Sequence, residues 1–178
     1  DVCSSDLLAA GDPSNTLWQR DLSVSHERIG DVRLAQGDLA GALEGYEACQ
    51  RVCAELAKRD PTNTEWQRNL SVSFERIGDV RVARGDLGGA LSAYEARHAI
   101  AERLAAGDPS NTLWQRDLIV SHWKLGDLAE RRSDADAAVR GFGAALRLAE
   151  RLAETGRLAP VDAYFPEELR RRLAAVGG

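Results

Sequence analysis

The sequence predicts an all-α fold: an α-solenoid of antiparallel helix pairs, with three repeats and a C-terminal capping helix. Three observations predict it. The chain carries an internal repeat of 48 residues, each repeat holds two amphipathic helix patterns, and the composition favours helix. Of the 178 residues, 44% are hydrophobic, 29% are charged and only 5 are proline, which is typical of a folded chain. One helix pair cannot bury its apolar side alone, so neighbouring pairs must stack.

The repeat is visible in an eight-residue segment that occurs three times. The segment DPSNTLWQ at 12–19 returns as DPTNTEWQ at 60–67 and as DPSNTLWQ at 108–115. The spacing is 48 residues both times (60 − 12 and 108 − 60), and a constant spacing of this size is typical of repeat architectures. We therefore expect repeats at residues 12–59, 60–107 and 108–155, the third with a degenerate second helix.

Each repeat begins with a predicted first helix. Thr16-x-x-Gln19 resembles a capping box, in which Thr16 is the N-cap and the Gln19 side chain reaches back to the cap. The helical pattern runs to about Gln36, and Gly37 suits the left-handed turn that ends a helix. The same signals recur in the later repeats, except that Ser133 replaces the turn glycine in the third. Glycines inside the first helices, such as Gly30, predict close packing against residues of the Ala42 type in the second helix. 

A second helix follows in each repeat. Asp38, Asp86 and Asp134 recur at the predicted N-cap position. After Asp38, apolar residues follow the helical i, i+3, i+4 spacing as far as Leu56. Because the turn between the two helices is only two or three residues long, the pair must be antiparallel.

These residues resemble the pattern of tetratricopeptide repeats. The resemblance rests on Ile29-Gly30, Gly37-Asp38, Ala42 and Tyr46, and on Ile77-Gly78, Gly85-Asp86, Ala90 and Tyr94 in the second repeat. It covers about residues 12–155. The 48-residue unit is 14 residues longer than the common unit of about 34, and is similar to long variants in bacterial multidomain signalling proteins. The resemblance implies a right-handed superhelix whose concave face binds protein segments.

One side of each first helix carries residues at alternating spacings of four and three, which places them on a single stripe. The resemblance implies that this stripe lines the concave face. We call these residues the first-helix stripe: Arg20, Val24, Glu27, Asp31 and Leu34; Arg68, Val72, Glu75, Asp79 and Val82; Arg116, Val120, Trp123, Asp127 and Glu130.

The acidic residues of the stripe have two open interpretations. Glu27 and Asp31 form a like-charge pair one turn apart, which is unfavourable in an isolated helix. Either basic residues of the same or a neighbouring unit neutralise them, or the groove presents acid to a partner. In the second case Asp31, Asp79, Asp127 and an exposed Trp123 would favour basic or mixed-charge segments. The family's clamp for carboxylate-ended peptides uses Lys and Asn, and Asp and Glu stand here instead, so that ligand class is disfavoured.

The predicted function is a protein- or peptide-binding scaffold and not an enzyme, with no cofactor and no metal. One alternative is self-assembly through the N-terminal face. Another is a sensor or regulatory region of a larger signalling enzyme with its catalytic domain upstream. Cys49 and Cys53 are interpreted as small buried side chains, since two ligands are too few for a metal site. His26 and His122 are interpreted as packing residues, and His98 as exposed.

The two ends of the chain differ from the repeats. Residues 1–7 back-translate into the end of a common sequencing adapter, so we expect a non-native scar, which an independent long-read sequence could refute. Residues 8–11 are interpreted as the end of a truncated preceding repeat. Residues 156–178 are predicted to form a loop and a capping helix at 166–176, with Arg170–Arg172 on its solvated side.

Charge and apolar content bound the partners. The net charge is −5 and no basic patch is present, which argues against nucleic acid as a partner. No apolar run approaches the roughly 20 residues that a membrane span requires. With only 3 cysteines and no disulfide pattern, the expected location is the cytoplasm.

Overall fold

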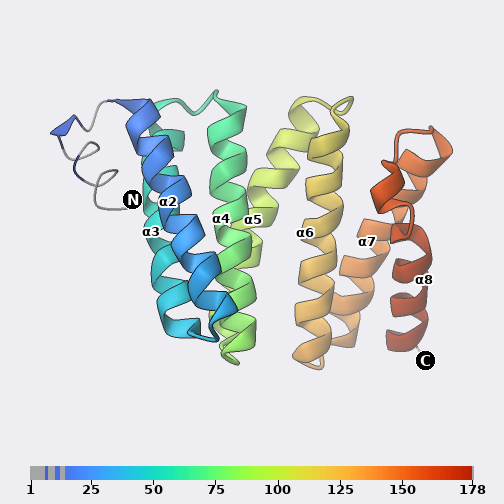
Figure 1. Ribbon diagram of the computed structural model, residues 1–178. Helices are drawn as coiled ribbons and strands as arrows, with labels where there is room; N and C mark the ends of the chain where they lie inside the picture. Colours follow the sequence, from blue (N-terminus) through green and yellow to red (C-terminus); the bar gives the residue numbers. More distant parts are fainter. Residues whose placement is uncertain (1–6, 8–10, 13–14, 178) are drawn as a thin grey trace. The chain divides into compact units, whose positions relative to one another are not determined.

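The computed structural model describes residues 7, 11–12 and 15–177 (Figure 1). These residues form helices, and no strand occurs among them. The elements in chain order are α2 (Thr16–Ala35), α3 (Leu39–Arg59), α4 (Thr64–Ala83), α5 (Leu87–Gly107), α6 (Thr112–Arg131), α7 (Ala135–Glu154), the 3-10 helix η1 (Pro160–Asp162) and α8 (Phe165–Val176). The predicted all-α fold of repeated helix pairs is confirmed.

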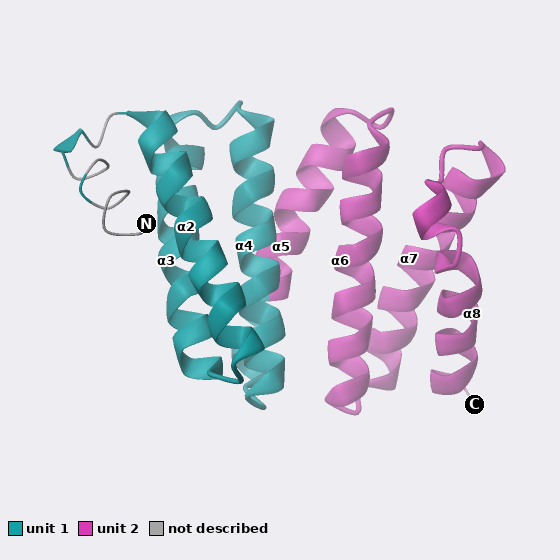
Figure 2. Cartoon of the chain, in the orientation of Figure 1, with its two compact units in different colours: residues 1–93 teal, residues 94–178 magenta. Residues whose placement is uncertain are grey.

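The chain divides into two compact units, residues 1–93 and 94–178, with the boundary inside α5 (Figure 2). In the first unit α2 packs against α3, and α3 packs against α4. In the second unit α6 packs against α7, and α7 packs against α8. The predicted handedness of the superhelix stays a prediction. The predicted adapter scar at 1–7 and repeat end at 8–11 fall, apart from Leu7 and Gly11, outside the described residues.

The first helices begin one residue earlier than the capping-box interpretation requires. Asn15, Asn63 and Asn111 are the N-caps, and the Asn63 side-chain oxygen accepts a hydrogen bond of 3.1 Å from the backbone of Trp66. The predicted Thr16 cap is therefore wrong, because Thr16 is already the first helical residue. An amide side chain at this position satisfies free N–H groups of the first turn as a threonine hydroxyl would.

The glutamine of the recurring segment connects two helices. The side-chain nitrogen of Gln67 donates 3.1 Å to the carbonyl of Ala57 in α3, and that of Gln115 donates 3.0 Å to the carbonyl of Ala105 in α5. The prediction that this glutamine reaches back to its own cap is wrong at both positions. Each bond satisfies a carbonyl near the end of the preceding helix, where carbonyl groups otherwise have no partner.

The turns within the repeats follow the prediction. Gly37 and Gly85 adopt φ of +79° and +78°, and Ser133 adopts φ of +60° at the same position of the third repeat. The next residue of each turn, Asp38 or Asp134, caps the second helix by accepting a backbone hydrogen bond of 2.9 Å. Asp86 does the same for α5.

The helices of a pair approach closely at a glycine. A Cβ added to Gly30 would lie 2.5 Å from the ring of Tyr46, and one added to Gly45 would lie 2.9 Å from the backbone nitrogen of Gly30. The close approach is confirmed, but Tyr46 and Gly45 are the nearest partners of Gly30 and not the predicted Ala42. A flat ring packed on a bare backbone explains why a helix interior keeps a glycine that costs about 1 kcal/mol relative to alanine.

The predicted capping helix is present as α8. Phe165 and Leu169 are buried in the same apolar cluster as Ile119 of α6 and Phe142 of α7. Its observed start, Phe165, is one residue before the predicted one. The segment expected to be a loop contains η1, and η1 brings the carboxylate of Asp162 into the interior.

Candidate functional site

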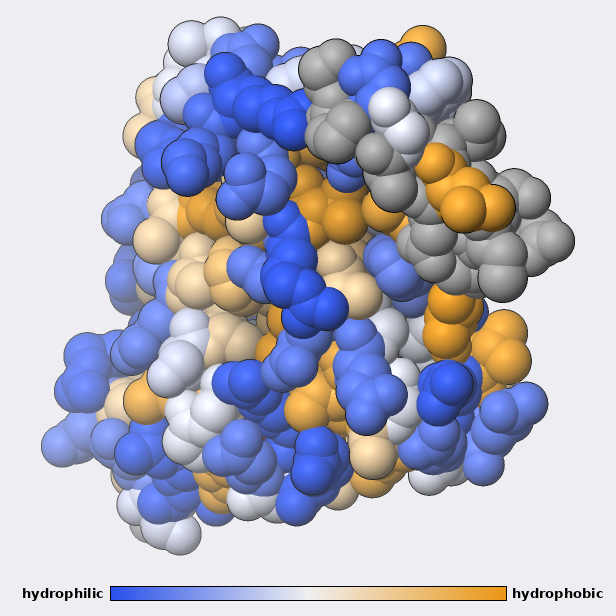
Figure 3. Space-filling model, turned by 90° about the vertical axis from the view of Figure 1, so that its left-hand side faces the viewer, coloured by the Kyte–Doolittle hydropathy of each residue, from blue (hydrophilic) through white to orange (hydrophobic). Residues whose placement is uncertain are grey.

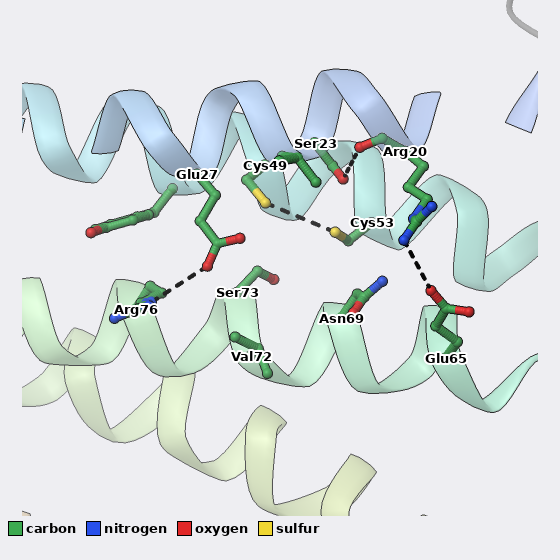
Figure 4. A pocket seen from close by; sticks show the side chains of 12 residues that line it. Arg20, Ser23, Glu27, Cys49, Cys53, Glu65, Asn69, Val72, Ser73 and Arg76 are labelled. Atoms are coloured by element: carbon green, nitrogen blue, oxygen red, sulfur yellow. Dashed lines mark hydrogen bonds and ion pairs between the residues drawn. The ribbon is translucent and has the colours of Figure 1, made fainter. Parts of the chain in front are cut away.

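The largest concentration of predicted site residues lies around a cavity of about 150 Å³ in the first unit, which we call the α2–α4 pocket. Figure 4 shows α2 on one side, α4 on the other and α3 behind them. The lining residues are Arg20, Ser23, Val24 and Glu27 of α2; Tyr46, Cys49 and Cys53 of α3; and Glu65, Asn69, Val72, Ser73 and Arg76 of α4.

Four residues of the first-helix stripe line this pocket: Arg20, Val24 and Glu27 from α2, and Val72 from α4. They are brought together because consecutive first helices lie next to each other above the second helix between them (Figure 4). Two further stripe residues of α2, Asp31 and Leu34, are exposed on the same helix outside the pocket.

Ion pairs join the two walls of the pocket. Glu27 of α2 lies 3.6 Å from Arg76 of α4, and Arg20 of α2 lies 3.7 Å from Glu65 of α4. Burial pulls the pKa of Arg76 down, but the carboxylates of Asp31 and Glu27 outweigh it, so the net shift is upward. In this unit, then, a neighbouring helix partly neutralises the acidic stripe.

Asp31 has its own partner in the second helix. The hydroxyl of Tyr46 donates a hydrogen bond of 2.6 Å to the Asp31 carboxylate. Burial, followed by this bond to a negative group, raises the pKa of Tyr46, so the tyrosine stays protonated. The bond holds the Tyr46 ring against Gly30 and leaves the second Asp31 oxygen available on the exposed side.

The floor of the pocket is polarisable and uncharged. The sulfur atoms of Cys49 and Cys53 lie 3.9 Å apart, and both residues are buried, as the sequence predicted. The hydrogen bond from Cys53, together with burial, raises the pKa of the Cys49 thiol. The hydroxyls of Ser23 and Ser73 donate to carbonyls of their own helices, at 2.7 Å each, which leaves their oxygens as acceptors.

The other stripe residues of α4 do not line the pocket. Arg68, Glu75, Asp79 and Val82 are half-buried. Each of the three charged residues among them has a polar partner. A requirement for free acid at Asp79, as one interpretation of the sequence supposed, is therefore not a basis for binding.

In the third repeat the chain's own C-terminal segment covers the stripe. Arg116 donates 2.7 Å to the buried carboxylate of Asp162, which raises the pKa of Arg116. The Trp123 ring meets Phe165 edge-on, with centroids 5.5 Å apart. The expectation of an exposed Trp123 is wrong, because this tryptophan is half-buried under α8. Val120 also packs against the core cluster of this unit.

The acidic residues of this stripe are paired as well. Arg172 of α8 lies 2.5 Å from Asp127 and also contacts Glu130. Burial raises the pKa of Asp127, and the Arg172 charge opposes that rise. The prediction that Arg170–Arg172 form one solvated side holds for Arg170 and Arg171, but Arg172 is turned inward onto α6.

The register of Arg172 explains this arrangement. Arg172 follows Arg76 by 96 residues (172 − 76), which is twice the repeat length, and Lys124 stands midway. Arg76 and Arg172 each contact an acidic stripe residue of an earlier first helix. α8 therefore takes the place of a first helix in a fourth, shortened repeat. The spacing of Arg28, Arg76, Lys124 and Arg172 was visible in the sequence and was the signal that the sequence interpretation missed.

A histidine pair lies in the second unit. The rings of His98 and His122 have centroids 4.5 Å apart, and His98 shares a hydrogen bond of 2.9 Å with Ser121. Burial lowers the pKa of His122 to about 4, with a further contribution from His98. The expectation of an exposed His98 is wrong, since it is half-buried. The pair packs between α5 and α6, as the interpretation of His122 as a packing residue requires.

Comparisons with known proteins add little beyond the helical fold. No family model matches the chain. No curated protein matches it. Among solved structures, it is similar to a de novo designed helical repeat protein, with 16% identity and a TM-score of 0.41 over 99% of this chain and 89% of the other. Since that score is low, the helical repeat assignment rests on the helix pairs of the chain itself.

Two further searches bear on the kind of site. Among the described residues, no three His, Cys, Asp or Glu side chains are grouped as a metal ion would require. Within the same residues, no helix combines the length and apolar character needed to cross a bilayer. The grouped features of the α2–α4 pocket are mixed charge, acceptor oxygens and apolar walls, which suit non-covalent binding of another molecule.

Proposed function

We propose that this chain is a protein-binding module that holds a peptide segment of its partner along α2 and α4. One side chain of the segment enters the α2–α4 pocket. The observation that carries the proposal is the cavity itself, which is lined by stripe residues of two consecutive first helices. The resemblance of the repeats to tetratricopeptide repeats supports the same surface.

The size of the pocket restricts the side chain that it accepts. An empty apolar cavity of about 150 Å³ holds a molecule the size of benzene. The α2–α4 pocket has about 150 Å³, with Val24 and Val72 as apolar walls and the two cysteines at its floor. It therefore suits one aromatic ring or branched aliphatic side chain, which serves as the anchor of the segment.

The rim of the pocket sets the charge of the segment. Arg20 and Arg76 contribute positive charge, and Glu27 and Glu65 contribute negative charge, in two ion pairs across the walls. A purely basic segment would face two arginines, and a purely acidic one would face two glutamates. The favoured partner therefore carries both signs on either side of an apolar anchor.

The test is a substitution that fills the pocket without entering the core. Val24 is 39% exposed at the pocket wall, and Val139 of α7, which is 40% exposed, gives a matched control. Peptides are first selected from a random display library on the wild-type chain, and their affinities are then measured for Val24→Trp and Val139→Trp. We expect a loss of at least about tenfold, or 1.4 kcal/mol, for the first. Unchanged affinity in Val24→Trp, or equal losses in both variants, would rule out the pocket.

A further inference from the structure

The position of Val32 in its repeat is exposed, although the same position is buried in the later repeats. Val32 of α2 is 56% exposed, whereas Val80 of α4 and Leu128 of α6 are each 1% exposed. These residues are separated by 48 residues (80 − 32 and 128 − 80). The same apolar position therefore has a covering neighbour in two repeats and none among the described residues in the first.

The contacts around Val80 show what the covering neighbour is. Val80 and Ile77 belong to one apolar cluster with Ala42 and Tyr46 of α3, and Leu39 and Leu43 of α3 pack against that cluster. The neighbour is thus the second helix of the preceding repeat, which presents leucines one turn apart.

A charged contact fixes the register of that covering helix. Arg81 of α4 donates 3.1 Å to Glu47 of α3 and 3.1 Å to the carbonyl of Gly89. Arg33 is the equivalent residue of α2, and it contacts Asp38 of its own turn at 3.2 Å. A helix covering α2 would bring its counterpart of Glu47 to Arg33.

The surface around Val32 has the form of a shallow groove, which we call the α2 outer face. Figure 3 views the side of the first unit that α2 and α3 form, and hydrophobic residues run through it between hydrophilic ones. The groove is lined by Ser25, Arg28, Ile29, Val32, Arg33, Gln36 and Asp38. Its apolar centre and basic rim match the leucines and the glutamate that α3 presents to α4.

We propose that the α2 outer face binds the second helix of another repeat unit, with leucines at the positions of Leu39 and Leu43 and a glutamate at that of Glu47. This inference is independent of the α2–α4 pocket. A second copy of the chain is not the occupant, since α3 already packs on α4, and α7 on α8. The interface repeats the α3–α4 contact by one period, so its geometry is already present in the molecule.

The experiment supplies such a helix to the full chain. A copy of residues 12–59 is placed directly before Asp12, in the place of residues 1–11, and amide hydrogen exchange of α2 is compared with that of the unmodified chain. We expect exchange around Val32 to slow by at least about tenfold, because a covered helix opens less often. In the same extended chain, Val32→Asp should cancel the slowing, and Val139→Asp should preserve it.

Three outcomes would overturn the proposal. Exchange that does not slow in the extended chain means that α2 accepts no such helix. Slowing that survives Val32→Asp places the contact elsewhere. If the unmodified chain sediments as a dimer that Val32→Asp converts to a monomer, the face binds a second copy and not a separate repeat unit.

Discussion

Arg172 of α8 lies 2.5 Å from the carboxylate of Asp127 in α6, and its guanidinium stands 4.8 Å from the centre of the Phe142 ring of α7. One side chain thus joins the terminal helix to both helices of the last repeat. The contact places an arginine where the repeat period puts Arg76 in the first unit. The terminal helix is held by the same interaction that joins first helices to each other.

Replacing Arg172 by alanine is expected to loosen α8. Asp127 is partly buried, and removing one partner of a buried ion pair leaves a charge without compensation. We expect a loss of about 2 kcal/mol, below the full cost of a deeply buried pair. Urea unfolding of the purified chain measures it.

Arg171→Ala is the control for this change. The Arg171 side chain is 72% exposed and pairs only with Glu168 of its own helix among the contacts given by the described residues. Exposed pairs of this kind contribute less than about 1 kcal/mol. Equal losses in the two variants would show that the Arg172 contacts do not hold α8.

The Ser133→Gly substitution should stabilise the third repeat. Ser133 adopts φ of +60°, and the equivalent Gly37 and Gly85 show that the turn requires this conformation. A side chain in the left-handed region costs about 1–2 kcal/mol, part of which is lost again to the greater freedom of glycine in the unfolded chain. We expect a net gain of about 0.5–1 kcal/mol in thermal unfolding, and Gly85→Ser should lose a similar amount. A lower stability of Ser133→Gly would contradict the strain.

The helix pairs should not tolerate a methyl group at Gly45. A Cβ there would lie 2.9 Å from the backbone nitrogen of Gly30, and backbone cannot move aside as a side chain can. We expect Gly45→Ala to lose about 1–3 kcal/mol, as overpacking does. Gly88→Ala is the control, because the nearest atom to its Cβ would be an Asp86 oxygen at 4.0 Å. Circular dichroism melts of both variants distinguish a local clash from a general effect of alanine.

The histidine pair should make the second unit sensitive to acid. Burial lowers the pKa of His122 to about 4, whereas an unfolded histidine titrates near 6.5. The unfolded state then binds more protons between these values, so the stability from neutral His122 is present above pH 6.5 and is lost as the pH falls toward 4.

His122→Phe removes this titration, since the second repeat carries Phe74 at the same position. The difference in urea midpoint between wild type and variant should change with pH between about 6.5 and 4 and be constant above pH 7. A difference that is the same at pH 4.5 and pH 7.5 would contradict the burial of a neutral ring.

The sequence predicted features that depend on one repeat, and missed features that depend on two. The turn at Gly37 and the cap at Asp38 follow from local backbone chemistry, so their residues alone indicate them. The bond from Gln67 to Ala57 depends on how a first helix meets the helix before it, which no local pattern encodes. The ambiguity between adjacent Asn15 and Thr16 is similar, because both residue types cap helices.

The same limit applies to the candidate site. The stripe spacing predicted Val24 and Glu27 on one side of α2, but not the cysteines of α3 behind them. The third stripe was predicted to be open because residues 165–176 have lost most of the repeat pattern. Only the period of Arg172 remains, and one arginine is a weak signal until the structure shows its carboxylate.

The most direct test of the binding surface is a methyl NMR spectrum of the chain with a selected peptide at saturation. The account predicts that the methyl signals of Val24 and Val72, which line the α2–α4 pocket, shift on binding, while that of the control Val139 stays in place. Shifts at Val139 or in α8, with unchanged signals from Val24 and Val72, would contradict it.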